Sequence, residues 1–152
     1  MTKPVPRAIV EGFYEALANN DMQALAGYLA DDVVWTISGP IDVLPFCGQR
    51  SGKAVVLELL HRDIPALLEK RRLIPNAILV DGDSAAVFGR LTASRGDIGR
   101  KISYRIAQFV RFRDEKAVEY MSIIDSFDAV EQVLGHQLAV PGGMRGGDLV
   151  AI

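Results

Sequence analysis

The hydrophobic pattern of this chain changes its period close to residue 73, and this change constrains the fold more than any other feature. Before it, apolar side chains recur at helical spacing, as in Ile9, Phe13 and Leu17. After it, apolar and β-branched residues form strand-length runs with turn residues between them. The runs cover residues 73–80, 85–93, 102–112 and 117–124. Helices followed by strands are typical of an α+β fold, in which helices cover one face of a meandering antiparallel sheet.

Cap and turn residues set the expected boundaries of the other elements. Asp21 can cap a second helix and Ser51 a third, because short polar side chains accept hydrogen bonds from the free N–H groups of a first helical turn. Residues 33–37 are rich in β-branched and aromatic side chains and predict a strand. Residues 41–50 are expected to form a loop that could serve as a lid. Turns are predicted at residues 81–83, 95–97 and 113–115, and a closing helix at 128–134.

Length and composition indicate one ordinary globular domain. Of the 152 residues 49% are hydrophobic and 24% are charged, and the formal net charge is −2. We expect a domain over residues 1–139 and a flexible tail over residues 140–152, which contain four glycines. The balanced charge argues against nucleic acid binding, and no apolar run reaches the roughly 18 residues that cross a membrane. Since the N-terminus also lacks the apolar core of a signal peptide, a cytoplasmic location is expected.

Few residues are available for disulfide or metal chemistry. Cys47 has no cysteine partner, and His61 and His136 lie far apart in the sequence. We therefore expect neither a metal site nor a cofactor.

Several stretches of the sequence resemble one group of proteins. Residues 13–17 (FYEAL) and 28–35 (YLADDVVW) resemble the start of ketosteroid-isomerase-like proteins. Residues 108–112 (QFVRF), 117–120 (AVEY) and 124–128 (IDSFD) are similar to the last two strands of SnoaL-like polyketide cyclases and limonene epoxide hydrolases. All of these proteins belong to the nuclear transport factor 2-like superfamily, and the resemblance covers about residues 7–135.

This resemblance implies a particular α+β shape: a cone-shaped, strongly bent antiparallel sheet wrapped around N-terminal helices. The interior of such a cone is a pocket for a small apolar or carbonyl-containing ligand, and many members form homodimers through the sheet. The pocket is then expected to be lined by nine residues: Phe13, Tyr14, Trp35, Ile37, Phe88, Thr92, Tyr104, Gln108 and Ile123.

Steroid isomerisation is disfavoured by the residues at the matching positions. That reaction needs an aspartate base, together with a tyrosine and a protonated aspartic acid that stabilise the dienolate oxygen. Ile37, Phe13 and Gln108 stand at these three positions. Tyr14 is one residue away from the tyrosine position, which on a helix rotates a side chain by about 100°.

The resemblance leaves two other reactions open, epoxide hydrolysis and ring closure. Limonene epoxide hydrolases use an aspartate, arginine, aspartate relay, of which Arg90 and Asp125 match two members and Thr92 replaces the third. Side chains two apart on a strand share a face, so Arg90 and Thr92 would both point into the pocket. SnoaL-type cyclases need chiefly an aspartate base and a shaped apolar cavity.

The main functional hypothesis is proton abstraction next to a carbonyl group, of the cyclase or isomerase type. Asp125 would act as the base, and Arg90 would orient the substrate or stabilise negative charge. Three alternatives stay open: a non-catalytic module that binds a small ligand, an epoxide hydrolase with an incomplete relay, and a structural domain whose cone is filled by side chains. Asp125 and Arg90 could also form a purely structural ion pair.

Overall fold

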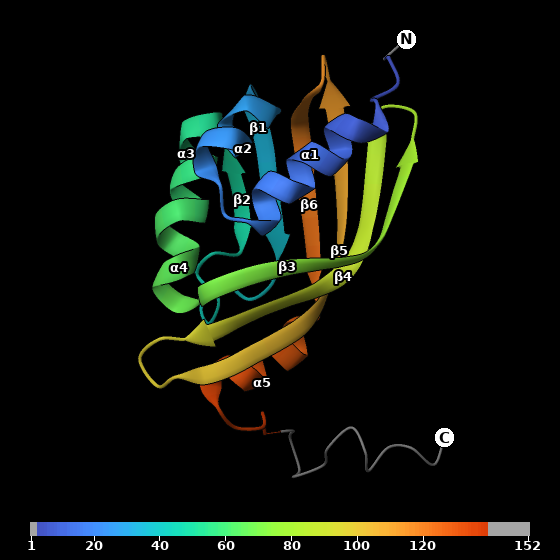
Figure 1. Cartoon of the computed structure of the whole chain (residues 1–152). Coiled ribbons are helices and arrows are strands. Elements are labelled where there is room, and N and C mark those ends of the chain that lie inside the picture. Colours follow the sequence, from blue (N-terminus) through green and yellow to red (C-terminus); the bar gives the residue numbers. More distant parts are fainter. Residues whose placement is uncertain (1–2, 140–152) are drawn as a thin grey trace, which may run out of the picture.

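The computed structural model describes residues 3–139, and the change from helices to strands is confirmed (Figure 1). The helical elements are α1 (Arg7–Ala18), α2 (Met22–Tyr28), α3 (Lys53–Glu58), a π-helical turn η1 (Leu59–Asp63), α4 (Ile64–Leu67) and α5 (Ser126–Leu134). The strands are β1 (Leu29–Ser38), β2 (Gly48–Ser51), β3 (Glu69–Asp81), β4 (Ser84–Arg95), β5 (Arg100–Arg113) and β6 (Lys116–Ile124). The flexible tail expected over residues 140–152 lies outside the described residues.

All six strands form one bent sheet in the order β2-β1-β6-β5-β4-β3. The predicted antiparallel meander is confirmed, because β3, β4, β5 and β6 pair antiparallel in chain order. Strand β2 also pairs antiparallel with β1, whereas β1 and β6 pair parallel. Parallel pairing requires a long crossover, and the chain between these two strands passes through α3, α4 and three further long strands. Helices α1 to α4 lie across the concave side of the sheet, as Figure 1 shows.

Local signals predicted some boundaries and missed others. Asp21 caps α2 as expected, since its carboxylate accepts a hydrogen bond of 3.0 Å from the Ala24 N–H. Ser51 does not cap the third helix, because it pairs with Val34 as the last residue of β2. Gly52 takes the N-cap position with a φ of 97°, a value that glycine adopts without steric cost. The expected loop over residues 41–50 ends in this short edge strand.

The core is centred on aromatic rings beneath α1. The Phe13 ring is fully buried, with ring centroids 5.0 Å from Tyr14 and 5.8 Å from Phe112. Trp35 and Tyr120 are register partners of β1 and β6, and their rings stack with centroids 3.5 Å apart. This packing joins α1 to the middle of the sheet. None of the helices within residues 3–139 is long and apolar enough to cross a membrane.

Candidate functional site

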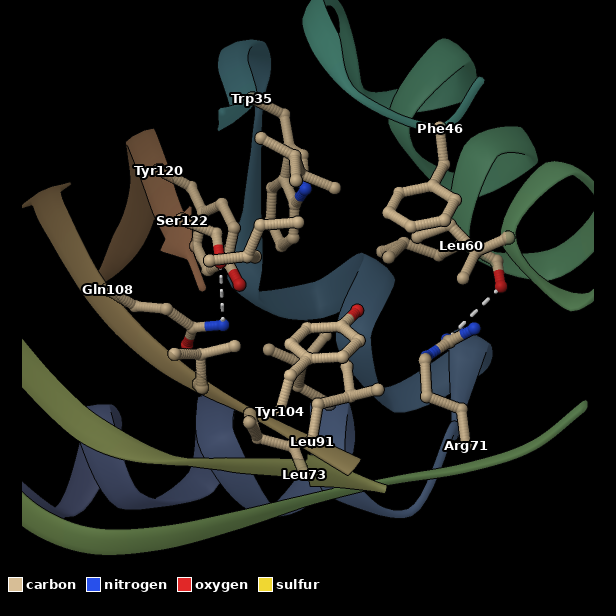
Figure 2. A pocket seen from close by; sticks show the side chains of 15 residues that line it. Trp35, Phe46, Leu60, Arg71, Leu73, Leu91, Tyr104, Gln108, Tyr120 and Ser122 are labelled. Atoms are coloured by element: carbon tan, nitrogen blue, oxygen red, sulfur yellow. Dashed lines mark hydrogen bonds between the residues drawn. The ribbon is translucent and has the colours of Figure 1, made fainter. Parts of the chain in front are cut away.

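A cavity, here called the central cavity, lies between the concave face of the sheet and the helices (Figure 2). The centre of a water-sized sphere can move through about 50 Å³ of it, which is room for a few water molecules or a small organic group. Its walls are mostly apolar and include Leu17, Phe46, Leu73, Leu91, Ile106 and Ile124. The polar and aromatic groups that line it are Trp35, Arg71, Tyr104, Gln108, Tyr120 and Ser122.

Strand alternation brings these side chains to one face. Even-numbered residues of β5 and β6 point inward, among them Tyr104, Gln108 and Ser122, while their odd-numbered neighbours point outward. On β4 the phase is opposite, so Leu91 faces the central cavity. The other side chains of these strands, including those of Arg90 and Ile123, lie on the convex side of the sheet, here called the outer face.

Two buried polar atoms at the central cavity lack a hydrogen-bond partner within residues 3–139. They are the indole Nε1 of Trp35 and the amide Oε1 of Gln108. The amide Nε2 of Gln108 donates to Ser122 Oγ at 3.4 Å, a cross-strand contact between register partners. Since unpaired buried polar atoms are uncommon in folded proteins, they mark a place where a ligand or water can bind.

Arg71 brings a buried positive charge to the central cavity. Its side chain is 9% exposed, and its Nη2 donates to Asn20 Oδ1 at 2.8 Å and to the Leu60 carbonyl at 3.2 Å. Within the described part of the chain, Arg71 forms no ion pair with a carboxylate. Burial lowers the pKa of its guanidinium, but an arginine pKa is so high that the group stays charged.

The tyrosines of the central cavity are hydrogen-bond donors rather than bases. Burial raises the pKa of Tyr104, and it raises the pKa of Tyr120 as well. Both hydroxyls therefore remain protonated at neutral pH. They can donate a proton in a hydrogen bond to a ligand oxygen, but they cannot abstract one from carbon.

The two residues expected to be catalytic do not meet, and neither lines the central cavity. The Asp125 carboxylate accepts a hydrogen bond of 3.1 Å from Arg105, and Arg90 donates to Ser103 Oγ at 3.0 Å. The structural ion pair of Asp125 with Arg90, which the sequence left open, is therefore not formed among the described residues. Arg90 lies on the outer face because β4 turns the opposite residues inward, and Asp125 follows the last inward residue of β6 as the N-cap of α5.

The nine residues expected to line the pocket divide into three groups. Four line the central cavity: Trp35, Ile37, Tyr104 and Gln108. Phe13 and Tyr14 are buried in the core beneath α1 and are not part of its wall. Phe88, Thr92 and Ile123 are on the outer face, where Phe88 is 53% and Ile123 55% exposed. Their expected position in the pocket is therefore corrected, because the neighbouring residues of each strand are the ones that point inward.

Sequence reasoning missed Arg71, Leu91, Tyr120 and Ser122. A signal was present for Arg71, which stands two residues before the buried Leu73 and so shares its face of the strand. No such signal exists for Leu60 and Phe46 in the other wall of the central cavity. They belong to segments whose position depends on how the helices and the loop pack on the sheet.

A bent sheet with helices across its concave face, enclosing a small cavity, defines a nuclear transport factor 2-like fold. The family model for the SnoaL-like domain matches residues 10–120, and the chain belongs to this family. No curated protein matches the chain significantly.

Solved structures with the same fold include an enzyme candidate, a protein of unknown function and a protein crystallised with a small molecule. A candidate isomerase from Rhodopseudomonas palustris is 34% identical, with 84% of this chain and 94% of that chain covered and a TM-score of 0.70. A nuclear transport factor 2-like protein of unknown function from Burkholderia pseudomallei is 23% identical, with 83% and 95% covered and a TM-score of 0.75. TerC, co-crystallised with polyporic acid, is also 23% identical, with 84% and 96% covered and a TM-score of 0.74.

Proposed function

We propose that this protein binds a small, mainly apolar ligand in the central cavity, and that it does so without proton abstraction by Asp125. The observation that carries the proposal is the composition of the wall. None of the described residues lining the central cavity is an aspartate, glutamate or histidine. A general base must lie within hydrogen-bond reach of the proton that it removes, directly or through one water. The wall instead offers apolar surface and hydrogen-bond donors.

The catalytic alternatives use residues that lie elsewhere. Proton abstraction of the cyclase or isomerase type would require substrate to reach Asp125, whose carboxylate is already paired with Arg105. The epoxide hydrolase relay would require Arg90 and Asp125 to act on one substrate, and their side chains have different partners. That TerC was crystallised with polyporic acid supports a ligand-holding role for this fold. Because the chain is similar to a candidate isomerase, the experiment must also be able to detect turnover of a substrate.

Filling the central cavity is expected to weaken binding. Leu91→Phe adds volume inside it, whereas Thr92→Phe adds the same ring one residue away on the outer face. Trp35 is the only tryptophan, so its indole N–H signal in an NMR spectrum of the ¹⁵N-labelled protein reports on the site. Titration with acetamide and acetate should shift this signal, with at least about tenfold weaker binding in Leu91→Phe and unchanged binding in Thr92→Phe.

Asp125→Asn serves as the second control of this experiment. Because Asp125 does not line the central cavity, the exchange should leave affinity unchanged. If neither compound shifts the Trp35 signal in the wild-type protein, the proposal fails. Turnover of a carbonyl or epoxide substrate that Asp125→Asn abolishes would replace it with the catalytic hypothesis.

We also propose that the protein forms a homodimer through the outer face. Phe88, Phe109, Met121 and Ile123 are all 38% exposed or more, and the pairing of β4, β5 and β6 places them side by side. Exposed apolar clusters of this kind mark interaction surfaces. Two ion pairs border the patch, Arg111 with Glu119 and Arg105 with Asp125. A two-fold axis through the patch would set acidic and basic groups of one copy against those of the other.

A charge in the middle of this patch is expected to separate the two copies. Ile123→Glu should convert a dimer into a monomer in light scattering coupled to size-exclusion chromatography. Val55→Glu places the same charge on an exposed position of α3 and should leave the dimer intact. A wild-type protein that is monomeric at high micromolar concentration would disprove the dimer.

A further inference from the structure

We infer that the ligand of the central cavity is an anion, a small aliphatic carboxylate or enolate whose charged oxygen binds Arg71. This inference deepens the proposed function and rests on it. It starts from the imbalance of charge in the cavity wall. Arg71 is the one charged residue among those that the structure places there, and the described residues give it only neutral partners.

A buried guanidinium without a carboxylate is costly, because transfer of an ion from water into a protein interior loses its hydration. Both hydrogen bonds of Arg71 use the same nitrogen, Nη2. The other N–H groups of its planar fork donate to no protein atom within residues 3–139. A carboxylate can accept two parallel hydrogen bonds from such a fork, which makes it the ligand chemistry that best compensates the charge.

The π-helical turn explains why Arg71 is held in this place. In an α-helix the Leu60 carbonyl would accept from the N–H of Ile64, but that N–H donates to the Leu59 carbonyl instead. The next donor along the turn would be Pro65, which has no N–H. The Leu60 carbonyl is thus left free for Arg71. Such turns recur at functional sites.

Asn20 holds the same nitrogen of the guanidinium. Its Oδ1 accepts from Arg71 Nη2, and its Nδ2 donates to the Arg71 backbone carbonyl at 2.8 Å. This reciprocal pair holds the arginine side chain before any ligand arrives. A group that is already ordered loses less conformational entropy on binding, so the arrangement favours affinity.

Further donors face the same space. The Trp35 indole N–H has no hydrogen-bond partner within residues 3–139. The Tyr104 hydroxyl is close enough to Arg71 that their electrostatic interaction affects the pKa of both groups. In Figure 2 the Tyr104 ring lies between the Arg71 guanidinium and the Gln108–Ser122 pair, with the indole nitrogen above it. Arginine and tryptophan side chains can only donate. An oxyanion offers the several lone pairs that these groups need.

The surroundings of Arg71 also favour an anion. Arg71 and Leu60 also line a second hollow, whose wall includes Lys70 and His61. Arg71 therefore separates the central cavity from this hollow. A lysine beside it adds positive potential, which raises the local concentration of an approaching anion.

The test compares acetate with acetamide, two compounds of nearly equal shape that differ in charge and that suit the small volume of the central cavity. Both are titrated near neutral pH into the ¹⁵N-labelled full-length chain, with the Trp35 indole signal as readout. Acetate is expected to bind at least about tenfold more tightly, because a charge-assisted bidentate contact is stronger than a neutral one. Raised salt should weaken acetate binding and leave acetamide binding unchanged.

Variants of two arginines test whether Arg71 causes the preference for the anion. Arg71→Gln should abolish the preference for acetate, and Arg71→Lys should retain part of it, since lysine keeps the charge but loses the fork. Arg90→Gln removes a matching charge on the outer face and should change nothing. If Arg71→Gln does not fold, the wild-type comparison and Arg71→Lys still decide. Equal affinity of the wild-type protein for both compounds overturns this inference alone, whereas no binding of either compound overturns the proposed function as well.

Discussion

Replacing Phe13 by alanine is expected to lower the free energy of unfolding by about 3–5 kcal/mol, the usual cost of removing a buried aromatic ring. The Phe13 ring is completely buried and makes edge contacts with Tyr14 and Phe112, and its centroid is 6.4 Å from those of Trp35 and Tyr120. Its loss would leave a cavity that four aromatic neighbours cannot fill without moving. Urea denaturation followed by far-ultraviolet circular dichroism measures the change.

Phe127 offers a matched control for this measurement. It lies on α5 and is 55% exposed, so Phe127→Ala should change stability by no more than about 0.5 kcal/mol. A loss below about 1 kcal/mol in Phe13→Ala would contradict the aromatic core described here.

Gly89→Ala is expected to cost about 2–3 kcal/mol although it adds a single methyl group. A Cβ atom on Gly89 would lie 2.4 Å from the Ile74 carbonyl oxygen and 3.1 Å from the Pro75 Cα, both on the paired strand β3. Since these are backbone atoms, relief requires the two strands to separate. The register irregularity between Pro75 and Ala77 begins at this contact, so the glycine permits the close approach of β3 and β4.

The opposite sign is expected for Gly27→Ala. A Cβ at Gly27 has open space around it within α2, and alanine is the better helix former by about 0.8–1 kcal/mol. Thermal or chemical denaturation of both variants should therefore show one loss and one gain of stability. Equal stability of Gly89→Ala and the wild-type protein would contradict the strand geometry.

Strand β5 shows how much a single sequence can predict. Its apolar positions, from Ile102 through Tyr104 and Ile106 to Phe112, alternate with Lys101, Arg105 and Arg111. This alternation agrees with the inward side that the family resemblance predicted for Tyr104 and Gln108, where the structure has them. A period of two is a local property, so no knowledge of the partner strands is required.

Strand β4 shows where the same reasoning failed. Its sequence allows either phase, because Val87 and Leu91 stand on one side and Phe88 on the other. The polar residues Arg90 and Thr92 share the side of Phe88 and indicate that this side faces outward, as the structure shows. The family resemblance instead placed Thr92 inward together with Arg90, the expected catalytic arginine.

The sequence by itself determined the α+β class, the order of helices and strands, the Asp21 cap and the inward side of β5, because each depends on neighbours a few residues apart. Tertiary structure alone decided the parallel pairing of β1 with β6, the phase of β4 and the partner of Asp125. It also decided that Arg71 meets Leu60 and Asn20, from segments 11 and 51 residues away in sequence. These contacts follow from how the helices pack on the bent sheet, which is a property of the whole chain rather than of any segment.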